Sequence, residues 1–115
     1  KELSNSEDVF NPNIVKVVDG LDKRAIYFSR NPIPFVRDFE QKDWLSKQKF
    51  YKHIGLYGYR FDVLKELVQL QSSMLEMSES LEQLRWLENG YQIFIAETKF
   101  ESIGIDTPDD LSKIS

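Results

Sequence analysis

The stretch His53-Ile54-Gly55-Leu56-Tyr57-Gly58-Tyr59-Arg60 combines the only histidine of the chain with two tyrosines, two of the five glycines and an arginine. Its residues alternate in the manner of a strand, so His53, Tyr57 and Tyr59 would share one face while the other face is apolar. The glycines remove side chains where another group could approach the backbone closely. We therefore expect a half-buried strand with a polar, aromatic face.

The composition predicts one soluble globular domain, since the chain has 115 residues, of which 41% are hydrophobic and 30% charged. Such a domain would bury roughly 65% of its unfolded surface. The absence of cysteine excludes disulfides, thiolate metal sites and cysteine nucleophiles, and it fits the cytoplasm, where we expect the protein to act. No apolar run approaches the ~18 residues of a membrane span, and the start lacks the apolar core of a signal peptide. We expect no membrane association.

The net charge of −4 disfavours nucleic acids as partners, because the molecule as a whole repels their phosphates. One stretch, Lys47–His53, interleaves basic residues with aromatic ones. A solvated face next to a strand explains such a stretch more often than a nucleic-acid site does. We therefore expect no nucleic-acid partner.

Three further runs predict strands. Ile14–Val18 and Ala25–Phe28 are rich in β-branched and aromatic residues, and Asp19-Gly20 between them suits a turn, so they are expected to form a hairpin. Tyr91–Ala96 is the third run and the clearest strand pattern in the chain.

Two helices are expected among these strands. The first begins at Phe61, where apolar residues fall at helical spacing, and is expected to pack on the sheet. Gln71–Ser78 interrupts the spacing, and its methionines are expected to fill gaps in the core. The second runs from about Ser78 to Asn89 and ends at Asn89-Gly90. The charged stretch Val36–Gln48 is expected to be partly helical. Alternating strands and helices predict an α/β or mixed α+β domain.

Three polar residues of the second helix lie off its apolar stripe of Leu81, Leu84 and Leu87. Glu82 and Arg85 stand one turn apart, a spacing that allows an ion pair, and Gln83 lies beside them. A solvated polar face is the default explanation for such residues. A binding role for them stays open at this point.

Arg30 follows a predicted strand and precedes two prolines, Pro32 and Pro34, which exclude a helix and favour a rigid extended loop. An arginine held in this way could direct its guanidinium at a fixed anion, since the group binds carboxylate or phosphate with two hydrogen bonds. The alternative is a surface arginine that pairs with a nearby carboxylate.

The carboxyl-terminal stretch carries signals for the start of a helix. Thr107 suits the N-cap, Pro108 the first helical position and Asp110 the third. The helix dipole explains the acidic residues inside that helix, but Asp106 stands just before the cap. Asp106 is therefore a candidate for another role.

Four separated stretches of the chain carry distinctive motifs. They are Asn11–Val18 with Tyr27–Arg30 and Ile33-Pro34, then His53–Arg60, then Leu81–Arg85, and lastly Gly104–Leu111. Together, and in this order, they resemble one family, the 3-deoxy-manno-octulosonate cytidylyltransferases, or CMP-KDO synthetases, and in particular the C-terminal half of their sequences.

The resemblance implies an α/β fold of the nucleotide-diphospho-sugar transferase type, which is Rossmann-like and also described as glycosyltransferase-A type. Residues 1–115 would be a single sugar-binding and dimerisation portion, at the C-terminal end of a longer nucleotidyltransferase domain. The implied enzyme is a homodimer that couples CTP and 3-deoxy-manno-octulosonate (KDO) to CMP-KDO and pyrophosphate for lipopolysaccharide synthesis. It requires Mg²⁺.

The same resemblance implies the site residues. The substrate-binding residues would be Arg30, His53, Tyr57, Glu82 and Gln83, and Asp106 would be a magnesium ligand. KDO carries a carboxylate and many hydroxyls, so cationic donors, amides and acceptors are suitable contacts, and magnesium prefers hard oxygen ligands. Arg60 and Arg85 match the motifs too, with a structural role open for both.

The chain departs from the family in its glycines. The family binds phosphates with a Gly-rich loop that lies upstream of the segment matched here, whereas the five glycines of this chain are scattered. By the same resemblance, the second aspartate that binds magnesium also lies upstream of this segment. Because the chain begins at Lys1 and not at a methionine, we expect a piece of a longer protein, inactive alone, with the CTP site mostly outside it. The alternatives are a noncatalytic dimerisation or ligand-binding module of this fold, or a cytidylyltransferase for another sugar acid such as a sialic acid.

Overall fold

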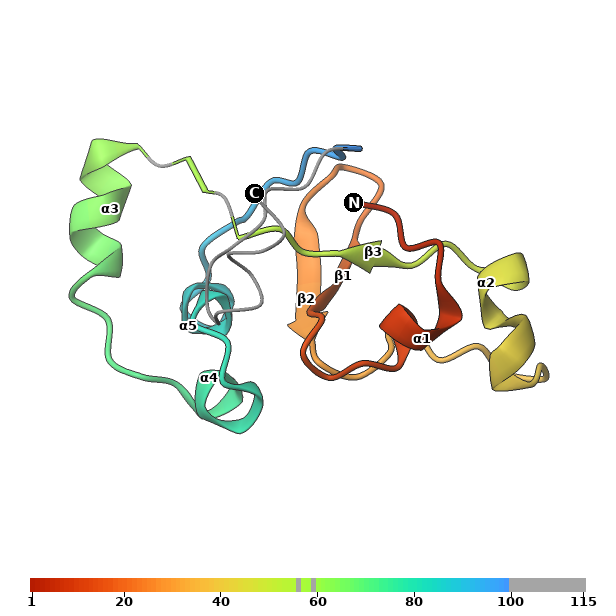
Figure 1. The fold of residues 1–115 in the computed structure, drawn as a ribbon. Coiled ribbons are helices and arrows are strands. Elements are labelled where there is room, and N and C mark those ends of the chain that lie inside the picture. Colours follow the sequence, from red (N-terminus) through yellow and green to blue (C-terminus); the bar gives the residue numbers. More distant parts are fainter. Residues whose placement is uncertain (56, 59, 100–115) are drawn as a thin grey trace, which may run out of the picture.

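The computed structural model describes residues 1–55, 57–58 and 60–99, which form a small three-stranded sheet and several short helices (Figure 1). The elements in chain order are α1 (Ser6–Val9), β1 (Lys16–Asp19), β2 (Ala25–Ser29), the 3-10 helix η1 (Gln41–Asp43), α2 (Trp44–Lys47), β3 (Tyr51–Lys52), α3 (Phe61–Leu67), α4 (Met74–Glu79) and α5 (Gln83–Glu88). None of the helices in the described ranges is long and apolar enough to cross a membrane.

The sheet has the order β2-β1-β3, with both neighbouring pairs antiparallel. The predicted hairpin of β1 and β2 is confirmed, with Val17 opposite Phe28 and an irregularity of register after Val18. Its turn is closed by a hydrogen bond from the Gly20 N–H to the Arg24 carbonyl of 2.9 Å. The described residues thus form a small structure of helices and strands, in which the sheet is antiparallel.

Two hydrophobic clusters flank this sheet. The first unites the amino-terminal segment with α2, and its buried members are Leu3, Val9, Trp44 and Phe50. The second joins the sheet to α5, and its buried members are Val17, Phe28, Leu81 and Leu84. The second cluster decides where α5 lies relative to β1 and β2, because burial of these apolar side chains is the main favourable term for packing the helix.

The predicted strand from His53 to Arg60 is wrong. β3 comprises only Tyr51–Lys52, and a last hydrogen bond of 2.8 Å runs from the His53 N–H to the Val15 carbonyl before the chain leaves the sheet. Gly55 and Gly58 follow in exposed backbone, where glycine weakens a strand because it has no side chain to pack. Residues 56 and 59 lie outside the described part.

The predicted strand Tyr91–Ala96 is also wrong, although the segment runs beside β2. It forms one isolated bridge, Arg24 with Phe94, and two flanking backbone hydrogen bonds, from Ala25 N–H to Ile93 and from Ile95 N–H to Lys23. Lys23 has a positive φ of 66°, so the backbone turns away there and the ladder does not continue. An alternating pattern thus produced a contact with the edge of the sheet instead of a strand.

The helix predicted at Phe61 is confirmed as α3, but it does not pack on the sheet. Figure 1 shows α3 standing apart from the strands, and Phe61 is 73% exposed and Val68 71% exposed. Leu67 is the buried residue of this helix. Apolar spacing predicted the helix correctly and its partner incorrectly.

The helix predicted from Ser78 to Asn89 is divided into α4 and α5 by Ser80, which adopts the left-handed conformation. The sequence signal missed here is a capping box of the form Ser-x-x-Glu: Glu76 lies three residues after Ser73, and the Ser73 N–H donates to its carboxylate at 3.0 Å. The methionines of α4 do not fill the core, since Met74 and Met77 are both exposed. The predicted end at Asn89-Gly90 is confirmed, with Gly90 at a positive φ of 85°.

Candidate functional site

A cavity of about 990 Å³ opens beside the sheet, between β1, β3, the amino-terminal residue and the segment after α5. Its walls combine apolar with charged side chains. Its lining includes Val17, Phe28, Lys23, Lys52, His53 and Tyr57. A mixed wall of this kind suits a small ligand that carries both polar and apolar groups.

His53 lies where the chain leaves β3, and its ring is half-buried between other rings. The ring centroid is 4.9 Å from that of Phe28 and 5.3 Å from that of Tyr57. Burial lowers the pKa of His53. The imidazole is therefore neutral at pH 7, with one nitrogen that donates and one that accepts.

Gln83 lies behind His53, on the first turn of α5. Its side-chain nitrogen is 3.5 Å from His53 Nδ1, and the residue is only 7% exposed. An amide N–H that donates to Nδ1 leaves the ring proton on Nε2. Gln83 thus favours a tautomer of His53 that offers an N–H donor from Nε2.

Tyr57 completes this group. Its ring also meets Trp86 edge-on, with centroids 5.0 Å apart. Three predicted site residues, His53, Tyr57 and Gln83, are therefore brought together, and Trp86 is a fourth member that sequence reasoning missed. The signal was available, because Trp86 stands three residues after Gln83 and so shares a face of α5 with it.

Arg30 is not part of this group. Its guanidinium donates to three backbone carbonyls: from Nε to Glu79 at 2.6 Å, from Nη1 to Pro12 at 3.0 Å and from Nη2 to Ser80 at 3.2 Å. The fixed anion expected for this group is thus replaced by the carbonyls at the end of α4 and in the loop before β1. Contact of Arg30 with a sugar acid stays a prediction.

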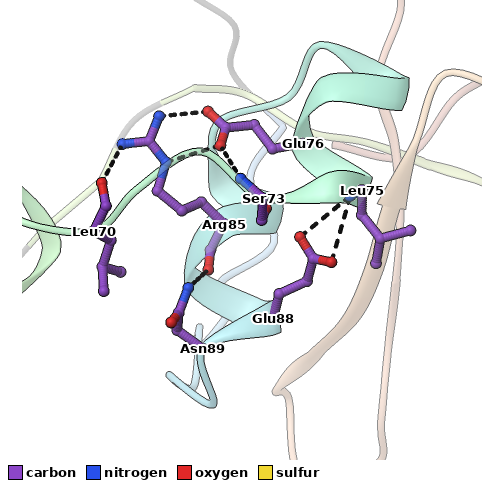
Figure 2. A network of polar contacts seen from close by, with 7 residues as sticks. All are labelled: Leu70, Ser73, Leu75, Glu76, Arg85, Glu88 and Asn89. Carbon is purple, nitrogen blue, oxygen red and sulfur yellow. Dashed lines mark hydrogen bonds and ion pairs between the residues drawn. The ribbon is translucent and has the colours of Figure 1, made fainter.

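Glu82 is exposed at the N-cap of α5, next to the buried Gln83. The ion pair allowed by the spacing of Glu82 and Arg85 is not the one formed. Arg85 pairs with Glu76 of α4 through two nitrogens and also donates to the Leu70 carbonyl, as Figure 2 shows. Arg85 is therefore structural, since it joins α5 to α4 and to the segment that follows α3.

The predicted metal ligand, Asp106, lies outside the described residues. Within residues 1–55, 57–58 and 60–99, no group of three or more His, Cys, Asp or Glu side chains is arranged to hold a metal ion. The described residues thus include His53 of the predicted substrate site and do not include the predicted metal ligand.

Lys16 is a buried charge that the sequence analysis passed over as one residue of a strand. It is 0% exposed, and its Nζ donates to the carbonyls of Asn11, Ile14 and Arg30 at 2.7–2.8 Å. Burial lowers the pKa of Lys16, partly opposed by the charge of Glu79. Three carbonyls satisfy all three donors of the ammonium group, so Lys16 fixes the loop on either side of the hairpin.

Comparisons with known proteins agree on one family. The family model described as Cytidylyltransferase matches residues 1–100. The 3-deoxy-manno-octulosonate cytidylyltransferase of Cytophaga hutchinsonii is 51% identical over the whole chain, which covers 46% of that protein. The protein of the same name from Parabacteroides distasonis is 57% identical over 91% of the chain and 42% of its own length.

A solved structure matches as well. It is a CMP:2-keto-3-deoxy-manno-octonic acid synthetase complexed with CTP, 41% identical in sequence, with a TM-score of 0.86 over 98% of this chain and 44% of that one. The chain therefore spans less than half the length of the curated relatives it matches. These matches do not support the expectation that it is the C-terminal half of such a protein. With a family model that covers residues 1–100 and relatives more than half identical, the chain belongs to the cytidylyltransferase family.

Proposed function

We propose that the protein carrying this chain is a cytidylyltransferase that couples CTP and KDO to CMP-KDO and pyrophosphate for lipopolysaccharide synthesis. The observation that carries the proposal is the group of His53, Tyr57 and Gln83 at the cavity, in a chain more than half identical to proteins named for this reaction. The solved neighbour with CTP supports the nucleotide.

The chemistry of the cavity suits a sugar acid. Lys23 and Lys52 line it and can attract a carboxylate, and Asp19 and Glu97, which line it too, can accept from hydroxyls. The neutral His53 offers a donor to a hydroxyl or carboxylate oxygen. Phe28 and Val17 supply apolar wall for the carbon skeleton. In this proposal Gln83 and Tyr57 hold the imidazole in place.

The reaction is a substitution at phosphorus. The anomeric hydroxyl of KDO attacks the α-phosphate of CTP, a C–O–P bond forms, the bond to pyrophosphate breaks, and the hydroxyl proton passes to solvent. Such transfers depend mainly on position and on stabilisation of charge. The described residues of this chain contribute the position of the sugar acid.

The proposal extends to Mg²⁺, with Asp106 as a ligand, and to a cytoplasmic homodimer, all on the family resemblance. The described residues hold no cluster of three or more His, Cys, Asp or Glu side chains that could bind the ion. Replacing Asp106 by alanine in the longer parent protein should reduce turnover by orders of magnitude with little loss of stability. A large loss of stability with turnover intact would make Asp106 a helix-capping residue instead.

The direct test is pyrophosphate release by the longer parent protein with CTP, KDO and Mg²⁺. We expect release with KDO, little with a sialic acid, and a loss of at least tenfold in kcat/KM for KDO in His53→Ala. The matched control is Gln69→Ala, an exposed residue after α3. Absence of release with KDO would reject the proposal, and preference for a sialic acid would reassign the substrate.

A noncatalytic module would be indicated by a different result. Saturation-transfer NMR would then detect KDO bound to the protein while no pyrophosphate appears under any combination of CTP and metal. That outcome separates the binding role of the cavity from transferase activity.

A further inference from the structure

The carboxylate of Glu79, at the end of α4, accepts hydrogen bonds from β2 and from the loop after it. The Tyr27 O–H donates to it at 3.2 Å and the Arg30 N–H at 3.0 Å, and the Ser29 side chain also acts on it, since it helps to lower the pKa of this carboxyl. In return, Arg30 binds the carbonyls of Glu79 and Ser80. We call these five residues, Tyr27, Ser29, Arg30, Glu79 and Ser80, the Glu79 cluster.

The Glu79 cluster lies close in sequence to the start of α5. Ser80 ends α4 in the left-handed conformation, Leu81 enters the core against Phe28, and α5 begins at Gln83. Only Leu81 and Glu82 therefore separate the cluster from the residue that contacts His53. The cluster and the buried leucines together determine where the first turn of α5 meets the sheet.

The carboxylate is kept ionised by its partners. Burial alone acts to raise the pKa of Glu79, but the hydrogen bonds from Ser29, Arg30 and Tyr27 together with the Arg30 charge outweigh it, so the pKa is lowered. Hydrogen bonds to an ionised acceptor are roughly twice as strong as neutral ones. Glu79 itself does not line the cavity.

We propose that Glu79 is a positioning residue for the sugar acid: through the Glu79 cluster it holds the first turn of α5 at the distance where Gln83 orients His53. This inference rests on the proposed function. A displacement of the order of 1 Å at a substrate-positioning group can reduce an enzymatic rate about 10²-fold. Loss of the cluster should therefore affect KDO far more than CTP.

The experiment compares Glu79→Ala, Glu79→Gln and Glu88→Gln in the longer parent protein. Glu88 is the matched control, because its exposed carboxylate accepts from the Leu75 N–H and so joins α5 to α4, while its effect on β2 is limited to a weak charge interaction with Tyr27. We expect about a tenfold rise in the KM for KDO in Glu79→Ala. The KM for CTP in Glu79→Ala should stay within about twofold of the wild-type value. In Glu79→Gln, the KM for KDO should lie between those of the wild type and Glu79→Ala, because an amide oxygen still accepts from Arg30. In Glu88→Gln, both KM values should match the wild type.

Two results would overturn the inference. One is a folded Glu79→Ala variant with an unchanged KM for KDO. The other is a rise of both KM values together, in step with a lower Tm, which would indicate a purely structural residue. If Glu79→Ala does not fold, Tyr27→Phe is the deciding variant, since it removes one hydrogen bond of the Glu79 cluster. It should raise the KM for KDO by a few-fold and leave the KM for CTP unchanged. An unchanged KM for KDO would reject the positioning role of Glu79.

Failure of the proposed function gives a separate result. A wild-type protein that releases no pyrophosphate with KDO rejects the transferase, whereas an active wild type with an unaffected Glu79→Ala rejects the inference only. Hydrogen exchange of the α5 amides adds a readout without turnover. Exchange should be faster in Glu79→Gln than in Glu88→Gln, and equal rates would count against the Glu79 cluster as the element that holds α5.

Discussion

The helices α3 and α5 share an amphipathic pattern and differ in what surrounds them. In α5, Leu84 is 0% exposed and Trp86 is buried. In α3, Leu67 is buried while Phe61 and Leu64 remain exposed. Spacing of apolar residues is therefore evidence for a helix and not for a packing partner, because one apolar face can be covered by any element that reaches it.

The contacts of the two helices explain the difference. α5 is joined to the preceding helix α4 by Arg85 with Glu76, as Figure 2 shows, and to the sheet by the burial of Leu84 with Val17 and Phe28. The Glu79 cluster connects the end of α4 to β2. The contacts of α3 are mainly local, with Arg60 paired to Asp62, although Tyr91 donates to Glu66 at 2.7 Å. Local pairs stabilise a helix without fixing its place in the fold.

The largest effect is expected when a leucine is shortened. Leu84→Ala should reduce the free energy of unfolding by about 3 kcal/mol, because a fully buried side chain leaves a cavity. Leu64→Ala on α3 should cost about 1 kcal/mol or less, since much of that side chain already meets solvent. Urea unfolding measures both. Equal losses would mean that α3 and α5 are packed alike.

A second difference is expected in acid. The hydrogen bond from Arg85 is the main cause that lowers the pKa of Glu76. A carboxylate with a lowered folded pKa stabilises the protein above its unfolded pKa, about 4.3, and this contribution is lost as the pH falls through the folded pKa. Glu76→Gln should therefore flatten the acid limb of a plot of unfolding free energy against pH.

The control for the acid experiment is on α3. Asp62→Asn removes a carboxylate whose pair with Arg60 is exposed on both sides, so its acid limb should stay close to that of the wild type. If Asp62→Asn changed the acid limb more than Glu76→Gln does, the ion pair on α3 would contribute more to stability than the one between α4 and α5.

A smaller effect concerns His53, the only histidine of the chain. Because burial lowers its pKa, the ring signals should titrate in NMR with a midpoint below the ordinary value of about 6.5. Gln83→Glu on α5 should raise that midpoint, since an anion beside Nδ1 favours the imidazolium. Gln69→Glu, exposed beyond α3, should leave it unchanged, and equal shifts would show that Gln83 does not contact the ring.

The smallest effect is expected at the end of α3. Val68→Ser replaces an exposed apolar side chain and should change the free energy of unfolding by no more than about 0.5 kcal/mol in urea. A loss above about 2 kcal/mol would show that another part of the protein covers Val68.

The candidate site was predictable in part. The motifs pointed to His53, Tyr57 and Gln83, and the structure brings these three together. The motifs also pointed to Arg30, whose guanidinium is bound by carbonyls from two other segments. Glu79 carried no motif, since its role depends on β2 donors that lie about fifty residues earlier in the chain.

Short-range chemistry explains what the sequence by itself determined. The hairpin turn at Gly20, the start of α3 and the end of α5 at Gly90 each depend on a few neighbouring residues, and all three were predicted correctly. The left-handed Gly90 needs no distant partner, because glycine lacks the Cβ that makes this conformation costly.

Only the tertiary structure decided the rest. His53–Arg60 and Tyr91–Ala96 alternate like strands, but a strand exists only where another backbone pairs with it through hydrogen bonds. Among the residues that the structure describes, the sheet does not continue beyond His53 or around Phe94. The same reason applies to Lys16, Arg30 and Glu79. Segments that are far apart in sequence meet on folding, and they decide which carbonyl or carboxylate binds each of these groups. A local sequence pattern does not indicate these partners.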